Sequence, residues 1–223
     1  MNFTNLSNTF TIFGNFAVFD EDNIGIINKL FSDCKITINN ENNPNNKSGR
    51  YMQITDTNKH MTIFLRPNRI DVQLPGTVQE NKKKLINDAN DIYKAFYQMF
   101  EGSMATRIAV VASSFVFDDN NEALKELADR INLINGNMAE ISLRINYLDN
   151  VLDENINMVL NINNIMIGAS NTPNERRRAI MATFDINTAN NFNDERFNLH
   201  ELEPYFTKFY DIYLQKLKDL SNI

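Results

Sequence analysis

The residues of this chain best suited to bind a ligand are a set of arginines, because a guanidinium group binds phosphate or carboxylate through parallel hydrogen bonds. They are Arg66, Arg69, Arg107, Arg176, Arg177 and Arg178. The last three are consecutive at the start of a predicted strand, where Arg177 would point away from its two neighbours. That run cannot form one patch by itself. We predict all six as binding residues on the free face of a sheet, with charged strand and helix ends in solvent as the alternative explanation.

Nucleophilic catalysis lacks the residues that it needs. A nucleophilic Ser or Cys must lie near a base, usually His, and the only histidines are His60 and His200. His60 lies in a predicted turn, and Cys34 is expected to be a small apolar filler. There is no G-x-S-x-G motif, and with 7 glycines the chain has neither of the common phosphate-binding glycine patterns. We therefore predict no catalytic residue and no cofactor.

Metal binding is not expected either. The acidic groups Asp20-Glu21-Asp22 and Asp118-Asp119 both open predicted helices, where carboxylates cap free amides and interact well with the helix dipole. Hard-cation binding by these groups is the alternative. No H-x-x-x-H or C-x-x-C pair is present, so we predict no metal site.

Composition limits the partners and the location. The formal charge is −6 and the pI is about 5.0, which disfavours nonspecific binding to nucleic acid or to an anionic membrane. The first residues have neither the basic start nor the apolar run of a signal peptide. The apolar stretch at 108–111 is too short to span a bilayer. A single cysteine excludes an internal disulfide and indicates a reducing compartment. We predict a cytoplasmic protein without a membrane partner.

Residues 1–102 show alternating strand patterns and one long helical stripe. We predict strands at 10–19, 35–39, 50–55, 61–65 and 69–74, a short helix at 21–33 and a long helix at 77–100. The apolar face of the long helix is Leu85, Ala89, Ile92, Phe96 and Met99. The Asn-rich segment 39–48 contains Pro44 and is expected to be a loop.

Residues 103–223 repeat this order. Strands are predicted at 105–117, 140–148, 155–167 and 177–186, and a loop at 170–174. A short helix follows Asp118 and ends near Gly136. A long helix is predicted at 199–220. Its apolar face is Leu202, Phe206, Phe209, Tyr213, Leu217 and Leu220.

Two tripeptides support an internal duplication. Val18-Phe19-Asp20 recurs as Val116-Phe117-Asp118, each ending a strand before a short helix, and Asp91-Ile92-Tyr93 recurs as Asp211-Ile212-Tyr213. Convergence is the alternative, because Val-Phe-Asp suits any strand-to-helix junction. We predict an α+β protein in which two long helices pack on one face of an antiparallel sheet or sheets. Its related β-α-β(3-4)-α halves would span 1–102 and 103–223, as two units or one continuous domain.

Three stretches carry a family resemblance. They are Arg66-Pro67-Asn68-Arg69-Ile70-Asp71-Val72, Thr106-Arg107-Ile108 and Ala182-Thr183-Phe184-Asp185-Ile186. In these the chain resembles a sporadically distributed family of uncharacterised bacterial proteins, although it departs from the family pattern at 110–114. The element order is also similar to helix-grip and TATA-binding-protein-like folds. The family brings no established reaction, cofactor or site, and its patchy distribution suggests a role in phage–host conflict.

Three functions remain open from the sequence. The leading hypothesis is a non-enzymatic binding or adaptor protein that contacts a protein partner, in bacterial defence or phage counter-defence. The second is binding of nucleic acid or nucleotide by the free sheet face through the six arginines. The third is an enzyme with an unfamiliar carboxylate or arginine site, using Asp71, Asp185 or Glu140. A homodimer through the last helix is also expected, because Tyr205, Tyr210 and Tyr213 add more aromatic surface than one buried face requires.

Overall fold

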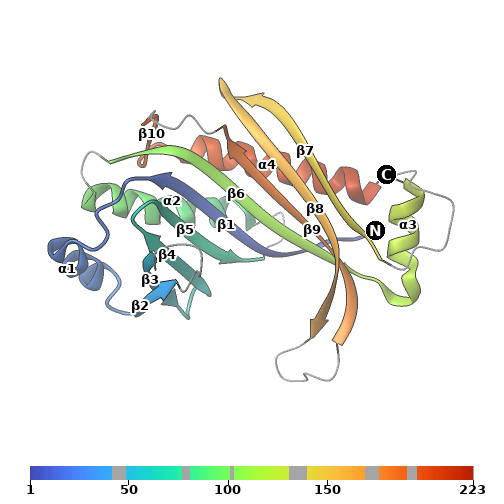
Figure 1. Cartoon of the computed structure of the whole chain (residues 1–223), viewed down its shortest axis with the longest axis horizontal. Coiled ribbons are helices and arrows are strands. Elements are labelled where there is room, and N and C mark those ends of the chain that lie inside the picture. Colours follow the sequence, from blue (N-terminus) through green and yellow to red (C-terminus); the bar gives the residue numbers. More distant parts are fainter. Residues whose placement is uncertain are drawn as a thin grey trace.

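The computed structural model describes residues 1–41, 49–76, 81–100, 103–130, 140–168, 176–189 and 195–222. Within them the chain forms an α+β fold with a ten-stranded antiparallel sheet and four α-helices (Figure 1). The strands are β1 (Thr4–Gly14), β2 (Lys35–Glu41), β3 (Gly49–Asp56), β4 (Met61–Arg66), β5 (Arg69–Pro75), β6 (Met104–Phe117), β7 (Ser142–Val151), β8 (Glu154–Gly168), β9 (Arg176–Thr188) and β10 (Phe197–Asn198). The helices are α1 (Glu21–Leu30), α2 (Lys82–Met99), α3 (Glu122–Arg130) and α4 (Glu203–Asn222). A 3-10 turn, Asp119–Asn121, precedes α3.

The sheet is centred on the pairing of β1 with β6. The strand order is β2-β3-β4-β5-β1-β6-β9-β8-β7, and the short β10 pairs with β6. On each side of the central pair the remaining strands run outward in reverse chain order, β5 to β2 on one side and β9 to β7 on the other. The β1–β6 pairing therefore joins the N-terminal and C-terminal strands into one sheet.

Phe10 of β1 is a point where both long helices meet the sheet. Its ring lies 5.1 Å from that of Phe206 in α4. Tyr93 of α2 donates a 2.6 Å hydrogen bond to the Phe10 carbonyl and a weaker one to the Ile70 carbonyl of β5. The helices α2 and α4 also contact each other, and α4 lies along β6 and β9 (Figure 1). Tyr93 thus ties α2 to the two neighbouring strands β1 and β5, whose side chains also build the site described below.

Most predicted strands are confirmed, and the largest errors concern element ends. The strand predicted at 10–19 is β1, which begins at Thr4 and ends at Gly14. The polar residues before Phe10 belong to the strand because they pair with β5 and β6 on both sides. Phe16 and Val18 leave the sheet although they are buried, so only the second Val-Phe-Asp tripeptide ends a strand. The strand β2 extends to Glu41, into the predicted loop.

The last helix begins later than predicted. Leu199 and His200 form a turn after β10, and α4 starts at Glu203 with Pro204 as its second residue. A proline is tolerated there because the first helical amides have no partner within the helix. The predicted helix start at 77, the rest of the loop at 39–48, the helix end near 136 and the loop at 170–174 lie outside the described residues. None of the described helices is long and apolar enough to cross a membrane.

Candidate functional site

The two sides of β1 differ in character. Phe10 and Ile12 are fully buried in the core, and the residues that alternate with them project from the opposite side of the strand. Thr11 is one of these, and the register pairs it with Asp71 of β5 and Ala109 of β6. We call the side of the sheet that carries Thr11 the Thr11 face, and we assign residues of other strands to it by register.

Four residues form one row across the Thr11 face. They are Arg66, Arg69, Phe13 and Arg107, on the neighbouring strands β4, β5, β1 and β6. Each is the direct cross-strand partner of the next, and we call this set the Arg66–Arg107 row. The Phe13 ring lies between two guanidinium groups, with its centroid 5.2 Å from Cζ of Arg69 and 4.7 Å from Cζ of Arg107. Both contacts are within the range of cation–π attraction.

Asp71 holds two of these arginines in place. Its carboxylate lies 3.0 Å from a terminal nitrogen of Arg66 and 2.7 Å from Nε of Arg69. Thr11 Oγ1 donates a 2.6 Å hydrogen bond to the same carboxylate, whose side chain is only 6% exposed. Like charges directly opposite on a sheet repel each other, and Asp71 offsets this between Arg66 and Arg69. Asp71 thus holds both guanidiniums in place and puts a negative charge between them.

Arg107 is held differently. It makes no salt bridge with any residue in the described ranges, and its Nε is buried without a hydrogen-bond partner among them. Burial lowers the pKa of Arg107, the nearby Asp185 carboxylate opposes this effect, and Arg69 adds to it. An arginine nevertheless keeps its proton in proteins. The site therefore contains a partly buried cation that an anionic ligand would stabilise.

The Thr11 face differs in charge from the chain as a whole. By register its basic residues are Lys35, Arg66, Arg69, Arg107, Arg144 and Arg177. Among strand residues whose side chains are described, the acidic ones on this face are Asp71 and Asp185. The face is thus locally basic although the formal net charge is −6. Local charge, rather than the net value, sets the field that an approaching ligand meets.

The six predicted arginines are not brought together as one group. Arg66, Arg69 and Arg107 share the row, whereas Arg176, Arg177 and Arg178 lie at the start of β9, near the end of β6. Arg177 is on the Thr11 face, packs over the Phe117 ring and pairs with Asp119. Arg178 points to the other side and pairs with Asp118. The predicted split of this run by strand alternation is confirmed.

The carboxylates named for an enzyme do not form one pocket. Asp71 and Asp185 are both on the Thr11 face, but β1 and β6 lie between their strands, which separates them by about 14 Å. Glu140 is exposed, just before β7. The described residues contain no group of three or more His, Cys, Asp or Glu side chains that could hold a metal ion.

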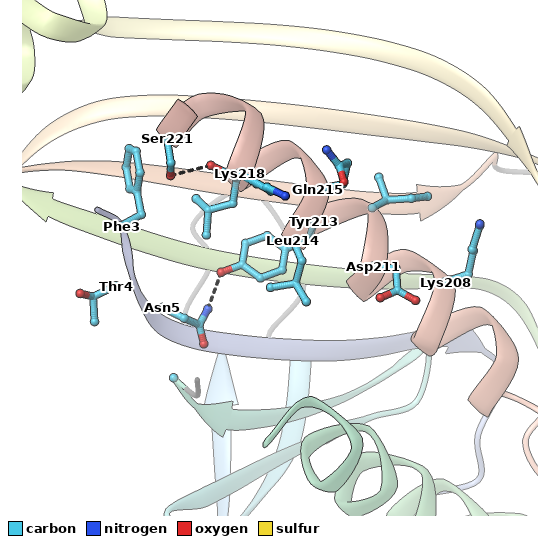
Figure 2. A pocket seen from close by; sticks show the side chains of 13 residues that line it. Phe3, Thr4, Asn5, Lys208, Asp211, Tyr213, Leu214, Gln215, Lys218 and Ser221 are labelled. Carbon is cyan, nitrogen blue, oxygen red and sulfur yellow. Dashed lines mark hydrogen bonds between the residues drawn. The ribbon is translucent and has the colours of Figure 1, made fainter. Parts of the chain in front are cut away.

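A groove of about 1080 Å³ lies between the N-terminal part of β1 and α4 (Figure 2). Phe3, Leu214 and Leu217 give it apolar walls, and the Tyr213 hydroxyl points toward Asn5. That hydroxyl accepts a 2.9 Å hydrogen bond from Asn5 and lies 2.6 Å from Ser114 Oγ, so the polar groups of the wall bind each other. None of the six predicted arginines lines the groove.

The aromatic residues expected to support a homodimer are largely buried. Tyr210 is 1% exposed and Tyr213 is fully buried, and their rings lie 5.1 Å apart within the chain. Burial raises the pKa of both phenols. Tyr205 is partly exposed and packs on Phe197. Most of the tyrosine surface of α4 thus packs inside the chain. The homodimer stays a prediction.

Searches with protein-family models and among curated proteins gave no match to this chain.

Proposed function

We propose that this chain is a non-enzymatic binding protein and that its Thr11 face binds a phosphate-bearing ligand, a nucleotide or nucleic acid. The observation that carries the proposal is Arg107, a partly buried cation without an ion-pair partner among the described residues, beside a pair of guanidiniums fixed by Asp71. Charge-assisted, bidentate hydrogen bonds from arginine are the usual means of binding phosphate. The locally basic face supports this choice despite the acidic pI.

Fluorescence anisotropy with a labelled oligothymidylate at low salt tests the proposal. We expect Arg107→Gln to weaken binding about tenfold, because it removes one charge-assisted phosphate contact. The slope of log affinity against log salt concentration should fall by about 1. Arg176→Gln is the matched control, because Arg176 is exposed and lies outside the row. Absence of binding by the unaltered chain at low salt would exclude a nucleic-acid ligand.

Two features of the architecture belong to the same proposal. We infer that α2 and α4 cover the side of the sheet opposite the Thr11 face, and that the halves arose by duplication. Reverse strand order on both sides of the β1–β6 pair supports duplication, as do Tyr93 and Tyr213, which are both fully buried. The Tyr93 hydroxyl bonds to Phe10 of β1 and the Tyr213 hydroxyl to Ser114 of β6, and each of these strands is the first of its own half.

Hydroxyl-radical footprinting should protect Phe206 and label Phe117. Strong labelling of Phe206 would contradict the covered face.

A protein partner is the second candidate, and the hairpin of β7 and β8 favours it. Leu148 is 83% exposed and Leu152 is 47% exposed, and Leu152 has a positive φ of 52° in the turn. Leu148 belongs to β7 and Leu152 to the turn that follows it, and two exposed leucines so close together suggest contact with another protein. A pull-down from the native host should recover a partner that Leu148→Ser and Leu152→Ser both lose. Equal recovery by these variants would exclude the hairpin as the contact. The adaptor role in phage–host conflict stays a prediction.

A further inference from the structure

A second arginine–aromatic group lies on the Thr11 face, far from the Arg66–Arg107 row. Phe115 and Phe117 of β6 belong to this face by register, and their rings meet edge to face with centroids 5.2 Å apart. Cζ of Arg177 lies 3.8 Å from the Phe117 centroid. Phe117 is 37% exposed, which is unusual for a phenylalanine in a sheet and leaves part of its ring open to a ligand. We call Phe115, Phe117 and Arg177 the Phe117 group.

The Phe117 group and the row are connected by one strand. Arg107 and Phe117 are both in β6, ten residues apart, which corresponds to about 33 Å of strand. The β6 residues between them on the same face are Ala109, Val111, Ser113 and Phe115. On the neighbouring strands the register borders this strip with Ser7 and Thr9 of β1 and with Asn187, Asp185, Thr183 and Met181 of β9, and Thr183 bonds to Ser113. The strip between the two arginine–aromatic ends therefore carries short side chains on β6 and β1, and Asp185 of β9 places one carboxylate beside its middle.

We infer that the ligand of the Thr11 face is single-stranded nucleic acid that runs along β6 and contacts both the Arg66–Arg107 row and the Phe117 group. This inference rests on the proposed function and names its ligand class. A mononucleotide is too short to reach both groups, whereas a stacked strand covers 33 Å with about ten nucleotides. Bases stack on exposed aromatic rings and phosphates bind the guanidiniums, which is how open sheet surfaces bind single strands.

The ion pair of Arg177 does not prevent this contact. Its side chain is 51% exposed and that of Asp119 is 63% exposed. An exposed pair of this kind is weak, so the guanidinium can exchange the carboxylate for a phosphate. A double helix fits less well. Its rigid, wide cylinder would touch the face along a single line, while a single strand can follow the curved sheet (Figure 1).

Length dependence separates this inference from the proposed function. We expect an oligothymidylate of about 12 nucleotides to bind at least tenfold more tightly than one of about 3 nucleotides, because only the longer strand reaches both groups. Arg177→Gln and Phe117→Ala should each weaken the longer strand about fivefold to tenfold and leave the shorter one unchanged. Arg107→Gln should weaken both. Arg177→Lys, which keeps the charge, should lose less than Arg177→Gln.

Three outcomes would overturn the inference, and they differ from each other. If both lengths bind equally and only Arg107→Gln weakens them, the ligand is confined to the row and the proposed function survives. If neither length binds, a nucleic-acid ligand is excluded, and of the proposed function only a nucleotide or another small phosphate-bearing ligand is left. If an extended acidic peptide binds through both groups more tightly than the oligonucleotide, the face recognises a protein segment. Circular dichroism and the midpoint of urea unfolding verify that each variant is folded, and Arg177 is exposed enough for its replacement to be tolerated.

Discussion

Two groups of arginines on the same sheet use their charges in different ways. In the Arg66–Arg107 row, residues from separate strands project to the same side, and one of them, Arg107, has no ion pair with a described residue. In the run that begins β9, consecutive residues project to opposite sides, and Arg177 and Arg178 each pair with a carboxylate just after β6. Charged residues that are adjacent in sequence thus project to opposite faces of the sheet, whereas charged residues far apart in sequence are brought to one face by the pairing of their strands.

Asp71 should show the largest difference between the two groups. Asp71→Asn removes a buried charge that two guanidiniums and Thr11 share, and we expect the free energy of unfolding to fall by about 3 kcal/mol. Asp119→Asn, which breaks the exposed pair with Arg177, should cost at most about 1 kcal/mol. Urea unfolding of both variants measures the contrast. Equal losses would mean that Asp71 does not organise the row.

Alkaline pH should have the second-largest effect, because it acts on Tyr93, whose hydroxyl bonds to the two strands β1 and β5 that carry Phe13 and Arg69 of the row. Burial raises the pKa of Tyr93 well above its ordinary value of 10.0, so the folded state keeps a proton that the unfolded state loses. The stability that Tyr93 contributes is complete below pH 10 and falls as the pH rises above it, by up to about 1.4 kcal/mol per pH unit. Urea unfolding between pH 8 and pH 11 measures this slope. Tyr93→Phe should reduce it, and an unchanged slope in that variant would show that Tyr93 is not responsible.

Thr11 should give the smallest effect. Thr11→Val removes the 2.6 Å hydrogen bond to Asp71 and should lower the free energy of unfolding by about 1 kcal/mol. Thr9→Val is the control, because Thr9 is on the same face and strand as Thr11 but is two residues away from the hydrogen bond between Thr11 and Asp71. Thermal and urea unfolding compare the two. An equal change in both variants would assign the effect to strand propensity rather than to the hydrogen bond.

Much of the sheet could be predicted because its patterns are local. The strands around Met61–Arg66 and Arg69–Pro75 follow from alternation and from the Pro67-Asn68 turn. The ends of β1 could not be predicted, since its polar residues are ordered by pairing with β5 and β6 on both sides. The apolar stripe of α2 was mostly right. It included Ile92, which is only partly buried, and missed Tyr93, which is fully buried.

The candidate site was less predictable than the strands. Arginine is chemically suited to bind an anion wherever it occurs in a chain. The sequence therefore indicated six arginines as binding residues, but it could not show that Arg66, Arg69 and Arg107 lie together and apart from Arg176–Arg178. The separation depends on the β1–β5 and β1–β6 registers, which are long-range contacts. The roles of Phe13 and Thr11 were missed for the same reason. The alternation in Thr9–Phe13 was a usable signal, because it assigns Thr11 and Phe13 to the side opposite Phe10 and Ile12.

The central claim is that Arg107, which has no ion-pair partner among the described residues, binds the ligand. Titration of the protein with the longer oligothymidylate, followed by nuclear magnetic resonance of the arginine Nε–H groups, tests it most directly. Arg196 is an internal control, because its Nε is also buried without a described partner but its guanidinium pairs with Glu154 at 2.6 Å. We predict that the Arg107 Nε–H resonance shifts with increasing ligand while that of Arg196 stays in place. A bound ligand that leaves the Arg107 resonance unmoved would contradict the account.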